Sequence, residues 1–161
     1  MLAGGVMTKP IAYIERTRRY YEAQGFGPYQ WAQHDEIPWQ PLNKPLAECR
    51  VAIVTTAVPD GSIAKPIRTA SSWRLDQAPE RFRTDELSWD KINTHTDDRC
   101  SYFPLEALEN LAASGVIGSL ATRFHFVPTE YSQRNTTTDD APVVVQACVE
   151  DEVDIAILIP L

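Results

Sequence analysis

The segment Thr94–Asp98, with the sequence THTDD, carries the densest set of side chains able to do chemistry. His95, Asp97 and Asp98 together have the groups needed to hold a proton or to bind the ammonium group of a substrate. They are weak metal ligands, because one histidine and two carboxylates without a second cluster seldom form a site. The simpler interpretation is a solvated turn in which Asp98 lies near the start of a helix, and substrate binding is the alternative.

Two further hydroxyl groups, Thr55 and Thr56, stand near the end of the apolar run RVAIVTTA at residues 50–57. This run is typical of a buried strand, and ligands gather beyond the carboxyl ends of the strands in open α/β sheets. We therefore expect Thr55 and Thr56 to donate hydrogen bonds to a substrate carboxylate. Plain β-propensity is the alternative explanation for threonine at a strand end.

The three cysteines and the two remaining histidines each stand alone. The cysteines are odd in number, far apart and without a C-x-x-C pair, which argues against a disulfide framework and against a zinc site. We expect Cys49 and Cys148 to be small buried side chains. Cys100 is expected to be partly exposed, with a redox role as its weaker alternative. His34 and His125 are expected to be structural.

Composition and motifs argue against several classes of function. The net charge of −7 disfavours a nucleic-acid partner, because phosphate backbones are bound by clustered Lys and Arg. No apolar run approaches the ~18 residues of a membrane span, and the amino terminus lacks signal-peptide features. We find no phosphate-binding loop, dinucleotide fingerprint, nucleophile elbow or H-E-x-x-H motif. We expect a protein of the reducing cytoplasm.

The elements that must position these residues alternate between helix and strand. The pattern predicts helices over residues 11–24, 104–114 and 139–153, and strands over residues 50–57, 67–75, 123–129 and 153–161. We expect Asp139 or Asp140 to cap the last helix. Such alternation predicts an α/β fold with a parallel sheet of about four strands and helices on both faces, flavodoxin- or Rossmann-like. A helix and a Pro/Trp-rich arm (residues 1–44) precede this domain (residues 45–161).

Three segments in a fixed order resemble a known family. They are RVAIVTTA, FPLEALENLAASGVIGSLA and VDIAILIPL. Together they resemble the selenoprotein B subunits of glycine, sarcosine and betaine reductase, and more closely the short selenoprotein subunit of D-proline reductase. The most specific part is Phe103–Leu108 followed by Gly115–Gly118. The resemblance runs, with gaps, over residues 45–161.

The resemblance implies reductive cleavage of a C–N bond beside a carboxylate, with a dithiol as the electron donor. In that family a selenocysteine or cysteine follows the strand similar to DIAILIPL directly. It therefore implies no catalytic residue within residues 1–161, a nucleophile immediately after Leu161, and a fold that is incomplete at its carboxyl end. Our hypothesis is that an unread selenocysteine codon follows Leu161. A naturally short chain is the alternative.

The same resemblance implies a small amine or amino-acid substrate and a partner reductase subunit, which can carry a pyruvoyl group. A homo-oligomer is a further expectation. The family has a His-Gly-Gly-Tyr-Asp-like segment where this chain has SWDKINTHTDD, so Trp89 or His95 falls at the histidine position. A function of a different class also stays open, namely a non-catalytic binding or assembly subunit that docks through the arm from Trp31 to Trp39.

Overall fold

The computed structural model describes residues 10–28, 32–59, 69–84, 90–129 and 132–161. The chain divides into two compact units, Met1–Pro38 and Trp39–Leu161. The predicted boundary, between residues 44 and 45, lies a little further along the chain. In the described residues, no helix combines the length and the apolar character needed to cross a membrane.

The first unit contains one helix, α1 (Tyr13–Ala23). Glu15 binds Arg18 and Arg19 one turn further on, at 2.7 and 2.8 Å, which supports the helix locally. The helix ends before Gly25, whose φ of +82° is the left-handed conformation that glycine adopts without strain. The helix predicted for residues 11–24 is therefore confirmed.

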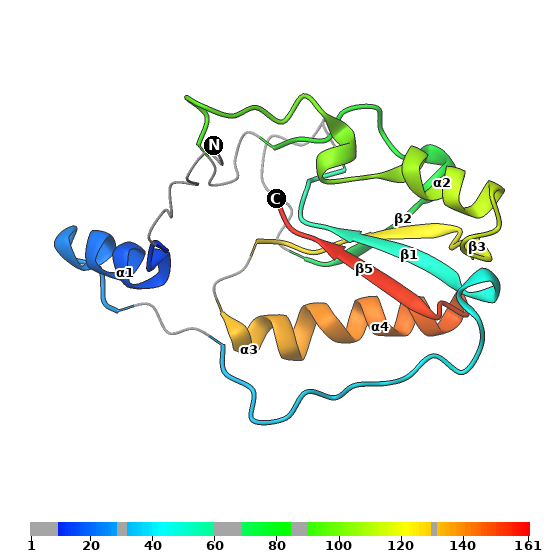
Figure 1. Ribbon diagram of the computed structural model, residues 1–161, viewed down its shortest axis with the longest axis horizontal. Coiled ribbons are helices and arrows are strands. Elements are labelled where there is room, and N and C mark those ends of the chain that lie inside the picture. The colour runs from blue at the N-terminus through cyan, green and yellow to red at the C-terminus, as the bar shows by residue number, and fades with distance from the viewer. Residues whose placement is uncertain (1–9, 29–31, 60–68, 85–89, 130–131) are drawn as a thin grey trace, which may run out of the picture. The chain divides into compact units, whose positions relative to one another are not determined.

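The second unit is built on a five-stranded sheet with β1 (Arg50–Thr55) at its centre. Along one side, β5 (Ile155–Ile159) pairs with β1 in parallel over its whole length. Along the other side, β3 (Ser119–Leu120) and β4 (Arg123–Phe126) pair in parallel with the beginning and the end of β1. The strands β2 (Ser71–Arg74) and β5 form the two edges of the sheet (Figure 1).

The sheet is not purely parallel, so that part of the prediction is wrong. β2 pairs with β4 in the antiparallel sense, with Ser71 opposite Phe126 and Trp73 opposite Phe124. A parallel neighbour would require a crossover connection, whereas an antiparallel strand can sit at the edge of an otherwise parallel sheet. The direction of β2 therefore depends on its antiparallel pairing with β4.

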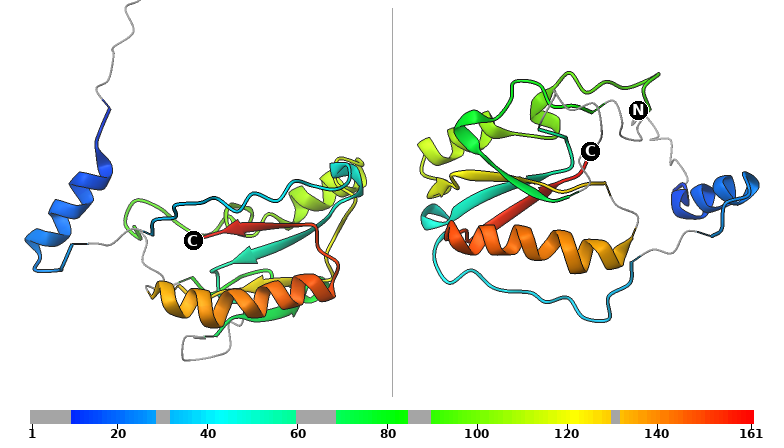
Figure 2. Two further views of the ribbon diagram at one scale, coloured as in Figure 1. Left: turned by 90° about the horizontal axis from the view of Figure 1, so that it is seen from below. Right: turned by 180° about the vertical axis from the view of Figure 1, so that it is seen from behind.

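The two longer helices of the second unit, α2 (Leu105–Ala113) and α4 (Ala141–Glu150), lie on opposite faces of the sheet (Figure 2). Neighbouring residues of β4 show this directly. Phe124 contacts the ring of Phe103, which precedes α2, while His125 contacts a side chain of α4. Successive side chains of a strand point to opposite faces, so each face receives one helix.

The helical run that ends in α4 begins earlier than its sequence predicts. A short helix, α3 (Gln133–Asn135), and a π-helical stretch (Thr136–Asp140) lead into α4 without a break. Ser132 caps this run, because its side chain accepts a hydrogen bond from the Asn135 N–H at 3.3 Å. The cap expected at residues 139–140 is therefore wrong, since Asp140 already has helical backbone angles.

The Gly-Val-Ile-Gly segment after α2 turns the chain into β3. Gly115 has a φ of +74°, and the Val116 N–H donates to the Leu111 carbonyl at 2.9 Å, as in a glycine-terminated helix. Gly118 then passes close to the main chain before β1, and its N–H donates to the Cys49 carbonyl at 3.0 Å. This segment therefore fixes how α2 meets the sheet.

The hydrophobic core lies on the α2 face and is rich in aromatic rings. Phe103 stands 4.7 Å from Phe82 and 4.8 Å from Phe124, measured between ring centroids. Tyr102 completes the group through an edge contact with Phe82 at 5.8 Å. Val51 and Ile53 of β1 belong to the same cluster. This packing holds the start of α2 against β1.

Candidate functional site

The parallel strands β1 and β5 end side by side, with Thr55 opposite Ile159 in the pairing. Beyond them, the Thr56 hydroxyl accepts a hydrogen bond from the Leu161 N–H at 2.8 Å and donates to the Leu161 carbonyl at 3.4 Å. These two hydrogen bonds hold Leu161 against the end of β1. The letter C marks this end of the chain in Figure 1. This carboxyl edge is where the sequence places the candidate site.

Thr55, at the end of β1, is only 1% exposed. Its hydroxyl donates to the Tyr102 carbonyl at 3.1 Å and accepts from the Ala57 N–H at 3.2 Å. The hydroxyls of Thr55 and Thr56 therefore both form hydrogen bonds with the main chain. A bond to a substrate carboxylate would have to replace one of these contacts, and it stays a prediction.

The two ends of the Thr94–Asp98 segment make different contacts. His95 is exposed, and its Nδ1 atom lies 3.7 Å from a carboxylate oxygen of Asp97. Asp98 points the other way along the chain and accepts a hydrogen bond from the Cys100 N–H at 3.0 Å. It caps a short 3₁₀ turn at Arg99–Ser101, which confirms the expectation that Asp98 stands near a helix start.

Two contacts tie this segment to the residues that follow β1. The hydroxyls of Thr96 and Thr84 lie 2.6 Å apart. The main chain of Arg83, next to Thr84, pairs with Val58 through two hydrogen bonds of 2.9 and 3.1 Å. The Thr94–Asp98 segment is thereby linked to the chain leaving β1. Trp89, the other residue considered for the histidine position, lies outside the described residues.

Cys100 is exposed shortly before α2, and its thiol contacts a carboxylate. The Cys100 Sγ donates to a Glu106 carboxylate oxygen at 3.3 Å, and Arg99 binds the other carboxylate oxygen. The hydrogen bond to Glu106 raises the pKa of the Cys100 thiol. Because the thiolate is the nucleophilic form, this contact makes Cys100 a poor nucleophile.

Replacing Glu106 with glutamine is expected to speed the alkylation of Cys100. The substitution removes the anion that raises the pKa of Cys100, so the thiolate fraction near neutral pH increases and the rate rises several-fold. Iodoacetamide labelling followed by peptide mass spectrometry measures this rate. Glu109→Gln on the same helix is the control and should leave it unchanged. An equal rate in both variants would contradict the assignment.

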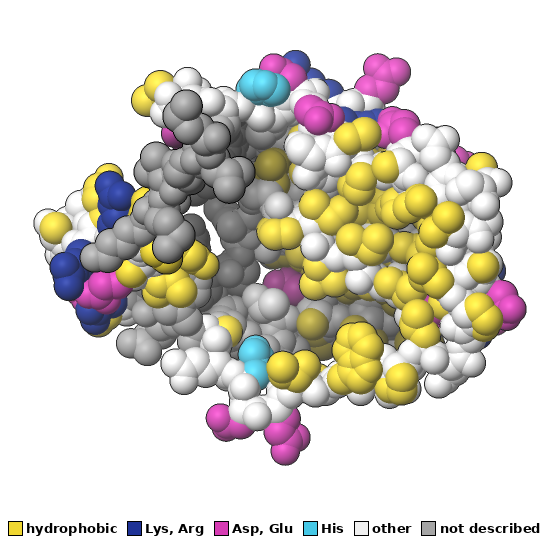
Figure 3. All heavy atoms as spheres, viewed as in Figure 1, with side chains coloured by type: hydrophobic (Ala, Val, Ile, Leu, Met, Phe, Trp, Pro, Cys, Tyr) yellow, Lys and Arg dark blue, Asp and Glu magenta, His cyan; other side chains and the backbone are white. Residues whose placement is uncertain are grey.

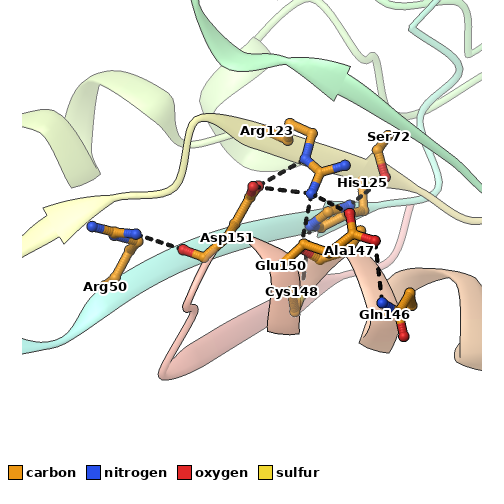
Figure 4. A network of polar contacts seen from close by, with 9 residues as sticks. All are labelled: Arg50, Ser72, Arg123, His125, Gln146, Ala147, Cys148, Glu150 and Asp151. Atoms are coloured by element: carbon orange, nitrogen blue, oxygen red, sulfur yellow. Dashed lines mark hydrogen bonds and ion pairs between the residues drawn. The ribbon is translucent and has the colours of Figure 1, made fainter.

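A second polar cluster lies on the α4 face and joins three elements (Figure 4). His125 of β4 is 0% exposed, with Nδ1 2.9 Å from the Ser72 hydroxyl and Nε2 3.5 Å from the Cys148 thiol. Burial lowers the pKa of His125 and raises the pKa of Cys148. A cysteine beside a histidine is the arrangement of a nucleophile and its base, but here burial favours the neutral form of both groups. The cluster therefore holds α4 against β2 and β4.

Beside this polar cluster, Arg123 forms hydrogen bonds with several groups at the carboxyl end of α4 (Figure 4). Its guanidinium donates to both oxygens of Asp151 at 2.8 and 2.9 Å, to Glu150 at 3.0 Å and to the Ala147 carbonyl at 3.1 Å. The hydrogen bonds from Arg123 to Asp151 lower the pKa of the Asp151 carboxyl. A cation at a helix carboxyl end also interacts favourably with the helix dipole. The arrangement is structural.

The buried imidazole predicts how stability depends on pH. Because burial lowers the pKa of His125, the unfolded chain takes up its proton at a higher pH than the folded protein. The free energy of unfolding should therefore fall as pH drops below about 6.5, by at most about 1.4 kcal/mol per pH unit. Carboxylates with a lowered pKa, such as Asp151, also stabilise the folded protein. Their contribution to the free energy of unfolding is lost only as the pH falls to about 4 and below.

Urea unfolding at a series of pH values between neutral and mildly acidic tests this. In the unsubstituted chain, the free energy of unfolding should fall as the pH is lowered. In His125→Asn this fall should be smaller, whatever the stability of that variant at neutral pH. Equal slopes in the two proteins would contradict the role of His125.

The remaining single residues follow their predictions in part. Cys49 is fully buried, as expected, and its thiol lies 3.4 Å from the Pro45 carbonyl. Cys148 is half-buried rather than buried, and His34 is exposed. The contacts of His125 with Ser72 and Cys148 were missed, because the three residues are far apart in sequence and no spacing links them.

One hollow among the described residues lies away from the carboxyl edge. A cavity of about 780 Å³ is lined by Arg74 and Asp76, by Glu109 of α2 and by the residues from Gly118 to Arg123. It lies beside β3, which pairs with the beginning of β1. Within the described ranges, no group of three or more His, Cys, Asp or Glu side chains could hold a metal ion.

The chain was also compared with known proteins. No protein-family model, curated protein or solved structure matches it.

Proposed function

We propose that this domain belongs to a selenol- or thiol-dependent reductase resembling D-proline and glycine reductases, with its nucleophile directly after Leu161. In the reaction, a C–N bond beside a carboxylate is broken and the substrate takes up an electron pair and two protons. A dithiol supplies both and becomes a disulfide. For D-proline the product is 5-aminopentanoate. The three unpaired cysteines suit a reducing cytoplasm.

The observation that carries the proposal is the placement of β1 and β5. After β1 the chain passes through the edge strand β2, then through α2 to β3 and β4 on one side of β1, and returns from β4 by way of α4 to β5 on the other side of β1. The connections therefore run in opposite directions on either side of β1, as at the switch point of a flavodoxin-like sheet. Ligands bind in the crevice beyond the strand ends at such a point. A residue following Leu161 would start there.

The groups around this edge suit the proposed chemistry. The Tyr102 carbonyl is bonded by Thr55, so the segment that starts α2 lies at the end of β1. The amino end of a helix stabilises an anion, and a selenolate or thiolate is the active form of the nucleophile. His95 and Asp97 stay candidates for binding the ammonium group of the substrate. The resemblance places any pyruvoyl group on a partner subunit.

The natural polypeptide, isolated from its source cells, tests the proposal. It should convert D-proline to 5-aminopentanoate, or cleave glycine, with dithiothreitol as the reductant, and alkylation should abolish the activity. The chain of residues 1–161 alone should show no turnover. Turnover by residues 1–161, or an inactive natural polypeptide supplied with its partner subunits, would overturn the proposal.

A second candidate is a non-catalytic binding or assembly subunit. It is favoured by the engaged hydroxyls of Thr55 and Thr56 and by the raised thiol pKa values of Cys100 and Cys148. None of these four groups is set up as a nucleophile. An inactive natural polypeptide that binds other proteins would support this candidate.

A further inference from the structure

We propose that the 161-residue chain forms a two-fold symmetric dimer in which the β5 strands of two copies pair antiparallel, so that one sheet runs through both. The proposal goes beyond the reductase function and does not depend on it. It rests on three features of β5, which are its open edge, its exposed apolar face and its self-complementary sequence.

The outer edge of β5 is open. Its inner edge pairs with β1, and in the described part of the chain no strand pairs with its outer edge. Unpaired strand edges attract other strands, and proteins usually protect them with charges, prolines or bulges. The opposite edge of the sheet carries the charged side chain of Arg74 on β2. From Ile155 to Leu161 there is no charge, and Pro160 is the sole protective residue.

The surface around this edge is apolar. α4 packs over β4 and β2 through His125 and Arg123, which leaves the same face of β5 uncovered. Leu158 at the centre of that face is 72% exposed, and Val145 and Val149 of α4 are exposed as well. Figure 3 shows hydrophobic side chains spread over the region where β5 lies in Figure 1, with charged side chains mainly at its margins.

The sequence of β5 complements itself in one register. A two-fold axis at Ile157 places Ile155 opposite Ile159 and Ala156 opposite Leu158. Each pair then occurs twice, as symmetry requires, and the small alanine leaves room for the exposed leucine.

Charge does not oppose this register. It places Asp154 opposite Pro160, so no two carboxylates face each other across the strands. For a chain of net charge −7, an interface that adds no acidic pair is the favourable one. These matches argue for a second copy as the occupant of this edge, rather than an unrelated strand or helix.

Sedimentation equilibrium tests the dimer. The unsubstituted chain of residues 1–161, with a mass of 18.1 kDa, should sediment at twice that mass. Leu158→Lys places a charge at the centre of the interface and should give a folded monomer, verified by circular dichroism. Ile92→Lys, at a site 93% exposed in a loop, is the matched control and should stay dimeric. A monomeric unsubstituted chain of residues 1–161, or a dimer that survives Leu158→Lys, would overturn the proposal.

Disulfide trapping tests the register. In a Cys100→Ser background, Ile157→Cys should form a cross-linked dimer on mild oxidation. Opposite residues of antiparallel strands have Cα atoms about 4.5 or 5.5 Å apart, which a disulfide can bridge. Ile155→Cys alone should not cross-link, because its partner position is Ile159. Efficient cross-linking at residue 155, or none at residue 157, would overturn this pairing.

Discussion

Phe103→Ala is expected to lower the free energy of unfolding by about 3–5 kcal/mol. Phe103 is fully buried and its ring contacts those of Phe82 and Phe124, so alanine would leave a cavity between α2 and β1. The neighbouring aromatic rings are large and constrained, which limits how far they can collapse into the space. Urea unfolding measured by circular dichroism gives the change.

Two variants control for this prediction. Phe103→Leu keeps most of the buried volume and should lose only part of that stability. Phe26→Ala removes an exposed ring from the first unit and should change the stability by no more than about 0.5 kcal/mol. If Phe103→Ala unfolded like Phe26→Ala, the aromatic core would not be the main support of α2.

Gly118→Ala is the second substitution with a large expected effect, about 2–3 kcal/mol of destabilisation. A Cβ atom at Gly118 would lie 2.6 Å from the main-chain carbon of Glu48 and 2.9 Å from its carbonyl oxygen. Main-chain atoms cannot rotate away as the end of a side chain can. The turn between α2 and β3 would have to shift, and the hydrogen bond from Gly118 to Cys49 would weaken.

The control for Gly118→Ala is Gly27→Ala, where the added Cβ meets nothing within 4 Å. It should leave the free energy of unfolding nearly unchanged. The double variant Gly118→Ala with Glu48→Ala separates two explanations, because the contact is with the main chain of Glu48. Recovery of stability in the double variant would show that the Glu48 side chain is responsible, against the geometry described here.

Part of the fold follows from local sequence patterns. The strands β1 and β5 are continuous apolar runs, and α2 has an apolar period that ends at Gly115, so all three were predicted. The direction of β2 was not, because it depends on pairing with β4 and leaves no mark in residues 71–74. β3 spans two residues, too few for any periodic signal.

The start of the α4 region shows a different limit. Its helical run begins with the polar sequence QRNTTTDD, which has no apolar period, so the prediction began the helix at the acidic residues 139–140. The capping hydroxyl of Ser132 comes several residues earlier. A polar helical turn without an apolar stripe cannot be told from a loop by its sequence alone.

For the candidate site, the sequence predicted the place of single residues in the fold but not their contacts. Thr55 and Thr56 were expected at the end of a strand, and Thr55 is the last residue of β1, opposite Ile159 of β5, with Thr56 directly after it. That Thr56 binds Leu161 and that Thr96 meets Thr84 follows from tertiary pairing, which joins residues far apart in the chain. These contacts decide which hydroxyls a substrate would have to displace.

The coding DNA directly after codon 161 tests the central proposal most directly. A nucleophile beyond Leu161 predicts a UGA selenocysteine codon or a cysteine codon at that position, followed by an open frame with a second cysteine codon a few residues on. A different stop codon, or an open frame without either residue, would contradict the reductase proposal. The binding or assembly subunit would then take its place.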